Sequence, residues 1–97
     1  MGKYLLLWEM DQTKVPISPQ ERGTAWPALL DMVKEDLKKG LKDWGLFSGE
    51  NNGYAVFEGT EVELGNMVQR YIPWVIFKAH AISSVDQVYE ILKALTK

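Results

Sequence analysis

Three short motifs mark where helices are expected to begin, and they constrain the fold more than any other feature of the sequence. They are Ser-Pro-Gln-Glu at 18–21, Thr-Glu-Val-Glu at 60–63 and Ser-Val-Asp-Gln at 84–87. In each motif the first hydroxyl can accept a hydrogen bond from the backbone N–H three residues later, and a Glu or Gln can return one. The chain is therefore divided into three helices separated by extended segments.

The first helix is expected over residues 19–40. Pro27 lies inside it and lacks a backbone N–H, so the helix is expected to kink or divide near Thr24. Asp36 is expected to be solvated. The apolar residues recur at close to the helical period, and they are Trp26, Leu29, Leu30, Val33, Leu37 and Leu41.

The second and third helices are shorter. The second ends before Pro73, because the residue before a proline disfavours the helical conformation. Its residues expected to be buried are Val62, Met67, Val68, Tyr71 and Ile72. The third is expected from Val85 to about Leu95, with an apolar stripe of Val85, Val88, Ile91, Leu92 and Leu95.

Four strands are expected, over residues 4–11, 44–50, 54–58 and 74–82. Asn51-Asn52-Gly53 lies between the second and third strands and is typical of a hairpin turn, because Asn and Gly tolerate a positive φ. Gly45 and Gly49 in the second strand indicate bulges or the close approach of another backbone.

Alternation along the first and fourth strands divides their residues between two faces of the sheet. Tyr4, Leu6, Trp8 and Met10 share one face of the first strand, and Leu5, Leu7 and Glu9 share the other. In the fourth strand, the wholly apolar set is expected beneath the helices: Val75, Phe77, Ala79 and Ala81. The mixed set, Trp74, Ile76, Lys78, His80 and Ile82, is expected beside Leu5, Leu7 and Glu9.

The expected order is β-α-β-β-α-β followed by an extra C-terminal helix, in one domain spanning residues 1–97. Two split β-α-β units predict a ferredoxin-like α+β fold: a four-stranded antiparallel sheet with both main helices on one face. Strands one and four are expected in the middle. No segment covers the second sheet face, which carries several large apolar residues, so we expect a homodimer formed through this open face.

The chain resembles small, uncharacterised members of the dimeric α+β barrel superfamily, which includes antibiotic-biosynthesis monooxygenase-like and muconolactone isomerase-like proteins. The resemblance is carried by the hairpin sequence Gly53-Tyr54-Ala55-Val56-Phe57-Glu58, which runs into Gly59-Thr60. It implies two sheets packed face to face in a dimer. It assigns no catalytic residue here, and the C-terminal helix departs from the shortest members.

The composition excludes several classes of function. The net charge of −2 and the absence of a basic patch argue against nucleic-acid binding. Without cysteine there are no disulfides, thiolate metal sites or cysteine nucleophiles, and a single histidine excludes a two-histidine zinc site. We therefore expect no metal and no cofactor. No apolar run is long enough to span a membrane, and a cytoplasmic protein is expected.

Two groups of residues are candidates for binding a ligand. His80, Lys78 and Glu9 share the mixed sheet face and, if they converge, could hold an anion or move a proton; polar residues at a dimer interface would have the same pattern. The four tryptophans could line a pocket for a planar ligand or simply pack the core. Trp44 and Trp74 are the better pocket candidates because each is expected to begin a strand, and Tyr54 is a further candidate.

Three classes of function therefore remain. The first is a homodimeric small-molecule-binding or regulatory protein, which we favour. The second is a cofactor-free enzyme of isomerase or oxygenase type that acts on a small aromatic or anionic substrate. The third is a structural interaction module. A pocket that contains His80 would favour the enzyme.

Overall fold

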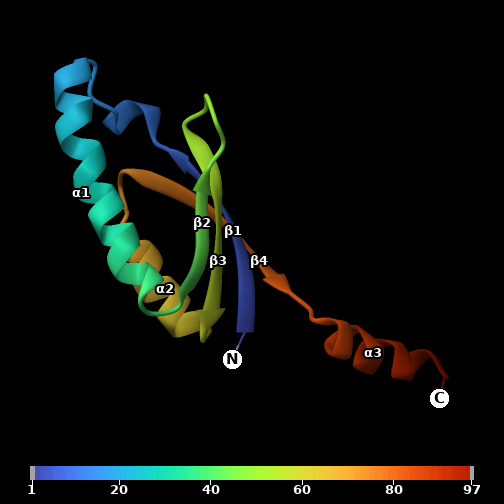
Figure 1. Cartoon of the computed structure of the whole chain (residues 1–97). Coiled ribbons are helices and arrows are strands. Elements are labelled where there is room, and N and C mark those ends of the chain that lie inside the picture. The colour runs from blue at the N-terminus through green and yellow to red at the C-terminus, as the bar shows by residue number, and fades with distance from the viewer. Residues whose placement is uncertain (1, 97) are drawn as a thin grey trace.

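The computed structural model describes residues 2–96. It comprises strands and helices in the predicted order: β1 (Gly2–Met10), α1 (Pro19–Leu37), β2 (Leu41–Leu46), β3 (Asn52–Gly59), α2 (Glu61–Gln69), β4 (Val75–Ile82) and α3 (Val85–Lys93) (Figure 1). Short 3₁₀ turns lie at Gln12–Lys14 and Ala94–Thr96. The protein is therefore α+β, with an open four-stranded antiparallel sheet.

The three helix starts were predicted correctly. The hydroxyls of Ser18, Thr60 and Ser84 each accept a hydrogen bond from the backbone N–H three residues later, at 3.1–3.4 Å. In return, the side-chain oxygens of Glu63 and Gln87 accept a hydrogen bond from the backbone N–H groups of Thr60 and Ser84. This completes a capping box at the start of α2 and of α3. These bonds satisfy backbone donors that have no partner within the helix.

The strand order in the sheet is β2-β3-β1-β4, and every neighbouring pair is antiparallel. The central place predicted for the first strand is confirmed, but the central place predicted for the fourth is wrong. The short connection at 47–51 keeps β3 beside β2, and β3 then pairs with β1. That pairing leaves β4 only the outer edge of β1.

Both α1 and α2 lie on one side of the sheet (Figure 1). The core lies between these helices and the sheet, and alternate residues of β1 form its centre. It consists of Leu6, Trp8, Met10, Val33, Leu41, Ala55, Phe57, Leu64, Met67, Tyr71 and Val75. We call the sheet surface on the other side, turned away from the helices, the open face.

Several burial predictions were wrong where the helix layer is shorter than the sheet. Val62 and Ile72 are exposed, because α2 turns Leu64 and Met67 toward the sheet instead. Ala79 and Ala81 were predicted to lie beneath the helices, yet both are exposed. They belong to the last half of β4, beyond the part of the strand that contributes buried side chains to the core.

The hairpin turn was placed too late by the sequence pattern. Asn52 and Gly53 belong to β3, and the turn residue with a positive φ (82°) is Gly49. Gly53 is required for a different reason: a β-carbon there would overlap the carbonyl oxygen of Gly45 and lie 2.7 Å from the Trp8 indole. The glycine therefore allows two strands and a tryptophan to approach closely.

Helix α1 continues through Pro27 without dividing, and its inward face is more polar than predicted. Asp36, expected to be solvated, is only 2% exposed. Its carboxylate accepts a hydrogen bond of 2.6 Å from the Tyr71 hydroxyl and pairs with the Arg70 guanidinium. These partners compensate for the removal of the carboxylate from water, which is otherwise costly.

The Asp36 contact predicts how stability depends on pH. Burial, and then the hydrogen bond to Asp36, raise the pKa of the Tyr71 hydroxyl above its usual value. A raised pKa in the folded state contributes stability that is complete below the unfolded pKa of about 10 and is lost as the pH rises above it. The free energy of unfolding should therefore fall above about pH 10.

We expect Tyr71→Phe to lower the free energy of unfolding by about 1.5–3 kcal/mol at neutral pH, because the Asp36 carboxylate loses a donor. The variant should also lose less stability than the wild type between neutral pH and about pH 10.5, because the phenylalanine ring has no proton to release. Urea unfolding at both pH values measures the two effects. An equal loss of stability between the two pH values in the wild type and in Tyr71→Phe would contradict the buried Tyr71–Asp36 contact.

Candidate functional site

The sheet separates the six predicted ligand-binding residues into distinct groups. Glu9, Tyr54, Lys78 and His80 lie on the open face, where Leu7 pairs with both Tyr54 and Lys78. The alternation predicted for the first and fourth strands is therefore confirmed. Of the remaining two residues, Trp44 lies on the core side of the sheet opposite Ala55, and Trp74 comes just before β4.

His80 and Glu9 do not converge. His80 pairs with Leu5, whereas Glu9 pairs with Ile76 at the other end of the same ladder. Four residues along a strand separate these positions by roughly 13 Å. Lys78 is the closer cation, because it lies opposite Leu7 and diagonally across from Glu9. Among residues 2–96, Glu9, Lys78 and His80 form no side-chain hydrogen bond or ion pair within the chain.

A shallow hollow lies beside the Glu9–Lys78 diagonal. It is lined by Leu7, Trp8, Glu9, Phe47, Asn52, Gly53, Ile76 and Lys78. The buried side-chain oxygen of Asn52 is the one such atom without a hydrogen-bond partner in the described part of the chain. Phe47 and Asn52 were not predicted as site residues, because the sequence pattern misplaced the turn that brings them here.

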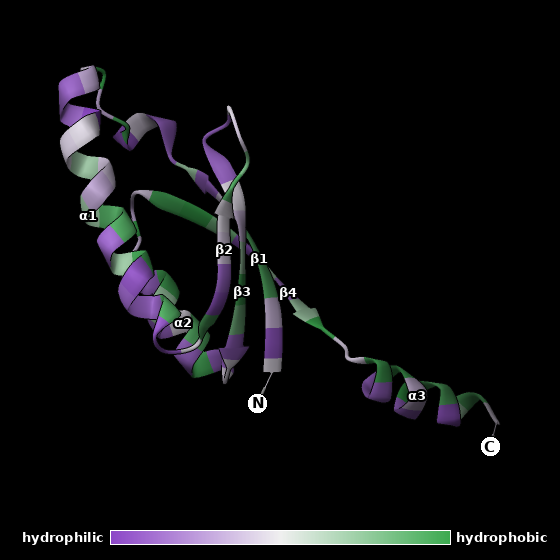
Figure 2. Cartoon of the chain, in the orientation of Figure 1, coloured by the Kyte–Doolittle hydropathy of each residue, from purple (hydrophilic) through white to green (hydrophobic). Residues whose placement is uncertain are grey.

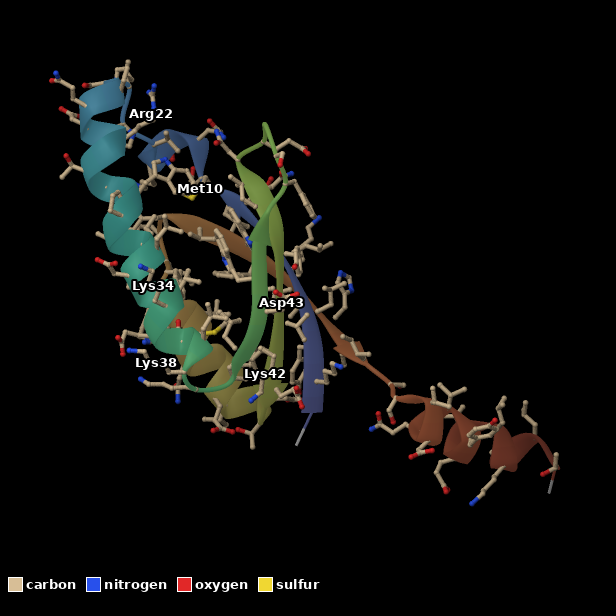
Figure 3. The ribbon with its side chains drawn as sticks, in the orientation of Figure 1. Met10, Arg22, Lys34, Lys38, Lys42 and Asp43 are labelled. Carbon is tan, nitrogen blue, oxygen red and sulfur yellow. The ribbon has the colours of Figure 1, made fainter. Side chains whose placement is uncertain are left out.

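Tyr54 makes a polar contact at the outer edge of the open face. Its hydroxyl donates a hydrogen bond of 2.8 Å to Asp43, which lies on the side of β2 away from α1 (Figure 3). This hydrogen bond is the main cause that raises the pKa of Tyr54. Its ring stacks near Phe47, with centroids 6.3 Å apart. The phenol is therefore held protonated and oriented within the chain.

Three tryptophans surround a second, very different site on the opposite side of the sheet. The rings of Trp8 and Trp44 stack with centroids 5.2 Å apart and planes within 9° of parallel, and Trp26 approaches from α1. We call this space the tryptophan pocket. It is lined by Trp8, Met10, Trp26, Leu29, Leu30, Val33, Leu41, Trp44, Ala55, Met67, Tyr71, Val75 and Phe77.

The tryptophan pocket is narrow and partly open. Its cavity volume is about 30 Å³, which is room for roughly two water molecules. A flat group the size of indole could therefore enter only if the surrounding side chains moved apart. Trp44 lines this space, where an inserted ligand would contact it. Trp74 is absent from the lining and lies 43% exposed just before β4.

No group in the tryptophan pocket is free for acid–base chemistry. The Trp8 indole N–H donates to the Tyr54 carbonyl at 3.1 Å, and the Tyr71 hydroxyl donates to Asp36. Tyr71 is the single ionisable residue of the lining, and its pKa is raised by burial. The candidate acid–base residues, Glu9, Lys78 and His80, lie on the other side of the sheet from this pocket.

Other kinds of site find no support in residues 2–96. No three His, Asp or Glu side chains gather there in a metal-binding arrangement. Within the same residues, none of the helices combines the length and apolar character needed to cross a membrane. No protein-family model matches the chain, and no curated protein is significantly similar to it.

Proposed function

We propose that the protein binds a small, flat, apolar ligand in the tryptophan pocket and works as a binding or regulatory protein rather than as an enzyme. The observation that carries the proposal is that the sheet separates the aromatic pocket from Glu9, Lys78 and His80. A ligand between Trp8, Trp44 and Trp26 meets apolar walls and no free acid or base. Such a site can recognise shape and aromatic surface.

The proposal extends to a homodimer of the ferredoxin-like, dimeric α+β barrel type, with the open faces of two chains packed together. The open face is half apolar: Leu7, Ile76 and Ile82 are 36–46% exposed. An apolar surface of this kind is costly to leave in water. The tryptophan pocket faces away from this interface and stays accessible.

The enzyme remains the alternative, and it would use the opposite side of the sheet. Its support is the hollow that contains Glu9 and Lys78. Against it, His80 lies too far from Glu9 for the two to act on one proton, and the hollow lies within the surface expected to be covered in the dimer. A ligand whose binding depends on Lys78 and not on the tryptophans would favour this alternative.

We expect Leu30→Trp to block the tryptophan pocket. Leu30 lies on α1 at the margin of the pocket and is 38% exposed, so a larger ring there can close the opening without creating a cavity. Indole and naphthalene serve as flat, apolar probes, with binding followed by chemical shifts of the backbone amides and of the tryptophan side-chain N–H groups. The variant should weaken binding of the better probe at least tenfold.

Leu37→Trp is the matched control. Leu37 lies on the same helix, is similarly exposed at 43%, and does not line the pocket. Its variant should bind the probe as the wild type does. Equal binding by all three proteins, or shifts confined to open-face residues, would refute the pocket as the ligand site.

The dimer is tested separately by light scattering coupled to size-exclusion chromatography. We expect a mass of about 22 kDa, twice the 11.1 kDa of one chain. Ile76→Asp should return the protein to one chain, because a carboxylate would be buried without a partner at the interface. Ile17→Asp introduces the same change at a residue that is 94% exposed before α1 and should leave the dimer intact. A wild-type mass of one chain at micromolar concentration would exclude the dimer.

A further inference from the structure

Helix α3 stands apart from the rest of the molecule. Every residue of α3 is exposed, and the element it packs against most is the short turn Ala94–Thr96 that follows it. The described chain is 61 Å long but only 24 × 20 Å across, with a radius of gyration of 16.4 Å. A compact chain of this length would have about 12.5 Å. The C-terminal segment is therefore an arm that extends from β4.

The arm has an exposed apolar side that could pack against another surface. Its apolar residues gather on one side of the helix, and they are Val85, Val88, Tyr89, Ile91, Leu92 and Leu95. The capping box at Ser84 and the 2.8 Å ion pair between Glu90 and Lys93 favour helix formation, yet they are too weak to hold nine residues helical alone. Burial of the apolar side is the missing contribution.

The arm and the open face border the same space. In Figure 1, α3 projects on the side of the sheet opposite to α1 and α2. In Figure 2 its hydrophobic side is turned toward the region in front of the open face, and its hydrophilic side is turned away. A hollow lined by Ser83, Val85, Val88, Tyr89 and Leu92 lies where the arm leaves β4. A body seated on the open face would therefore also contact the apolar side of α3.

We propose that α3 is an exchanged arm that packs against the second copy of this chain seated on the open face. This inference rests on the proposed dimer and adds a second contact to it. Four strands of about eight residues give an open face of roughly 500 Å², and the arm adds roughly 200 Å². Together they approach the roughly 800 Å² per partner of a stable interface, which the sheet alone does not reach.

The charge of the arm favours a protein partner over a lipid surface. Its polar side carries Asp86 and Glu90 against the single cation Lys93 within residues 85–96. Helices that lie on membranes usually carry several Lys or Arg on the polar side, which attract anionic lipids. The open face also carries both signs: Lys3 and Lys78 lie among Glu9, Asp43 and Glu58. A second copy can therefore meet this surface without strong net repulsion.

Paired substitutions measure what the arm contributes to the dimer. In Val88→Gln/Leu92→Gln the apolar side becomes polar, while glutamine preserves helix propensity. The control, Glu90→Gln/Lys93→Gln, introduces the same residue twice on the polar side of α3. We expect the dimer dissociation constant, from sedimentation equilibrium, to rise at least tenfold in the first variant and to stay within about threefold in the control.

A mixed sample shows whether the arm reaches the other chain. The protein has no cysteine, so Lys93→Cys accepts a single spin label on the polar side of α3. Chains that carry the spin label but no ¹⁵N are mixed with ¹⁵N-enriched chains that carry no spin label. Paramagnetic broadening is then read only on the ¹⁵N-enriched chains. Broadening of open-face amides, including Leu7 and Ile76, is the expected result.

The outcomes separate this inference from the dimer itself. A dimer whose dissociation constant is unaffected by Val88→Gln/Leu92→Gln, or a mixed sample without broadening, overturns the arm and leaves the dimer standing. A wild-type monomer overturns both. The protein could also co-sediment with vesicles of phosphatidylcholine and phosphatidylserine. If Val88→Gln/Leu92→Gln abolished that co-sedimentation, a membrane would be what binds the apolar side of α3, and the proposal would be overturned.

Discussion

One physical constraint governs this molecule: its sheet has two faces rich in apolar residues, and the two helices packed on the sheet cover only one. Strand β1 carries the constraint most clearly. Leu6 and Trp8 are buried beneath α1 and α2, while Leu7, between them, remains 39% exposed on the other face. Because successive side chains on a strand point to opposite faces, both patterns are fixed by the same few residues. The hydrophobic effect forms the core and leaves an exposed apolar surface at the same time.

The features that follow from local rules were predictable. Helix caps depend on residues three positions apart, and strand alternation depends on residues two apart, so the helix starts and the two faces of β1 and β4 were predicted correctly. Asp36 was misjudged because its partners, Arg70 and Tyr71, lie 34 and 35 residues along the chain. No local pattern reveals such a pairing.

The candidate site was predicted in part, for the same reason. Placing Lys78 and His80 beside Leu7 and Leu5 needed only alternation along two strands. The separation of His80 from Glu9 depends on the register of the ladder, which alternation does not specify. The stacking of Trp44 on Trp8 depends on the hairpin, whose turn lies at Gly49 rather than at Asn52 and Gly53. A tryptophan-lined pocket was among the expectations, but an error of a few residues in the turn was enough to hide the stacking of Trp44 on Trp8.

The separation of the two candidate surfaces has a consequence for how the protein could work. An apolar ligand in the tryptophan pocket contacts Trp8 and Met10, and the open face begins with the next side chains of the same strand, Leu7 and Glu9. Protein interiors are closely packed, so a small displacement on one side of a strand is transmitted to the other. The Trp8 indole lies so close to Gly53 that a β-carbon there would overlap it, so a ligand that displaced the indole toward Gly53 would press on the backbone of β3. A single strand would then link occupancy of the pocket to the surface on which a second chain is proposed to sit, which is the coupling that a regulatory binding protein needs.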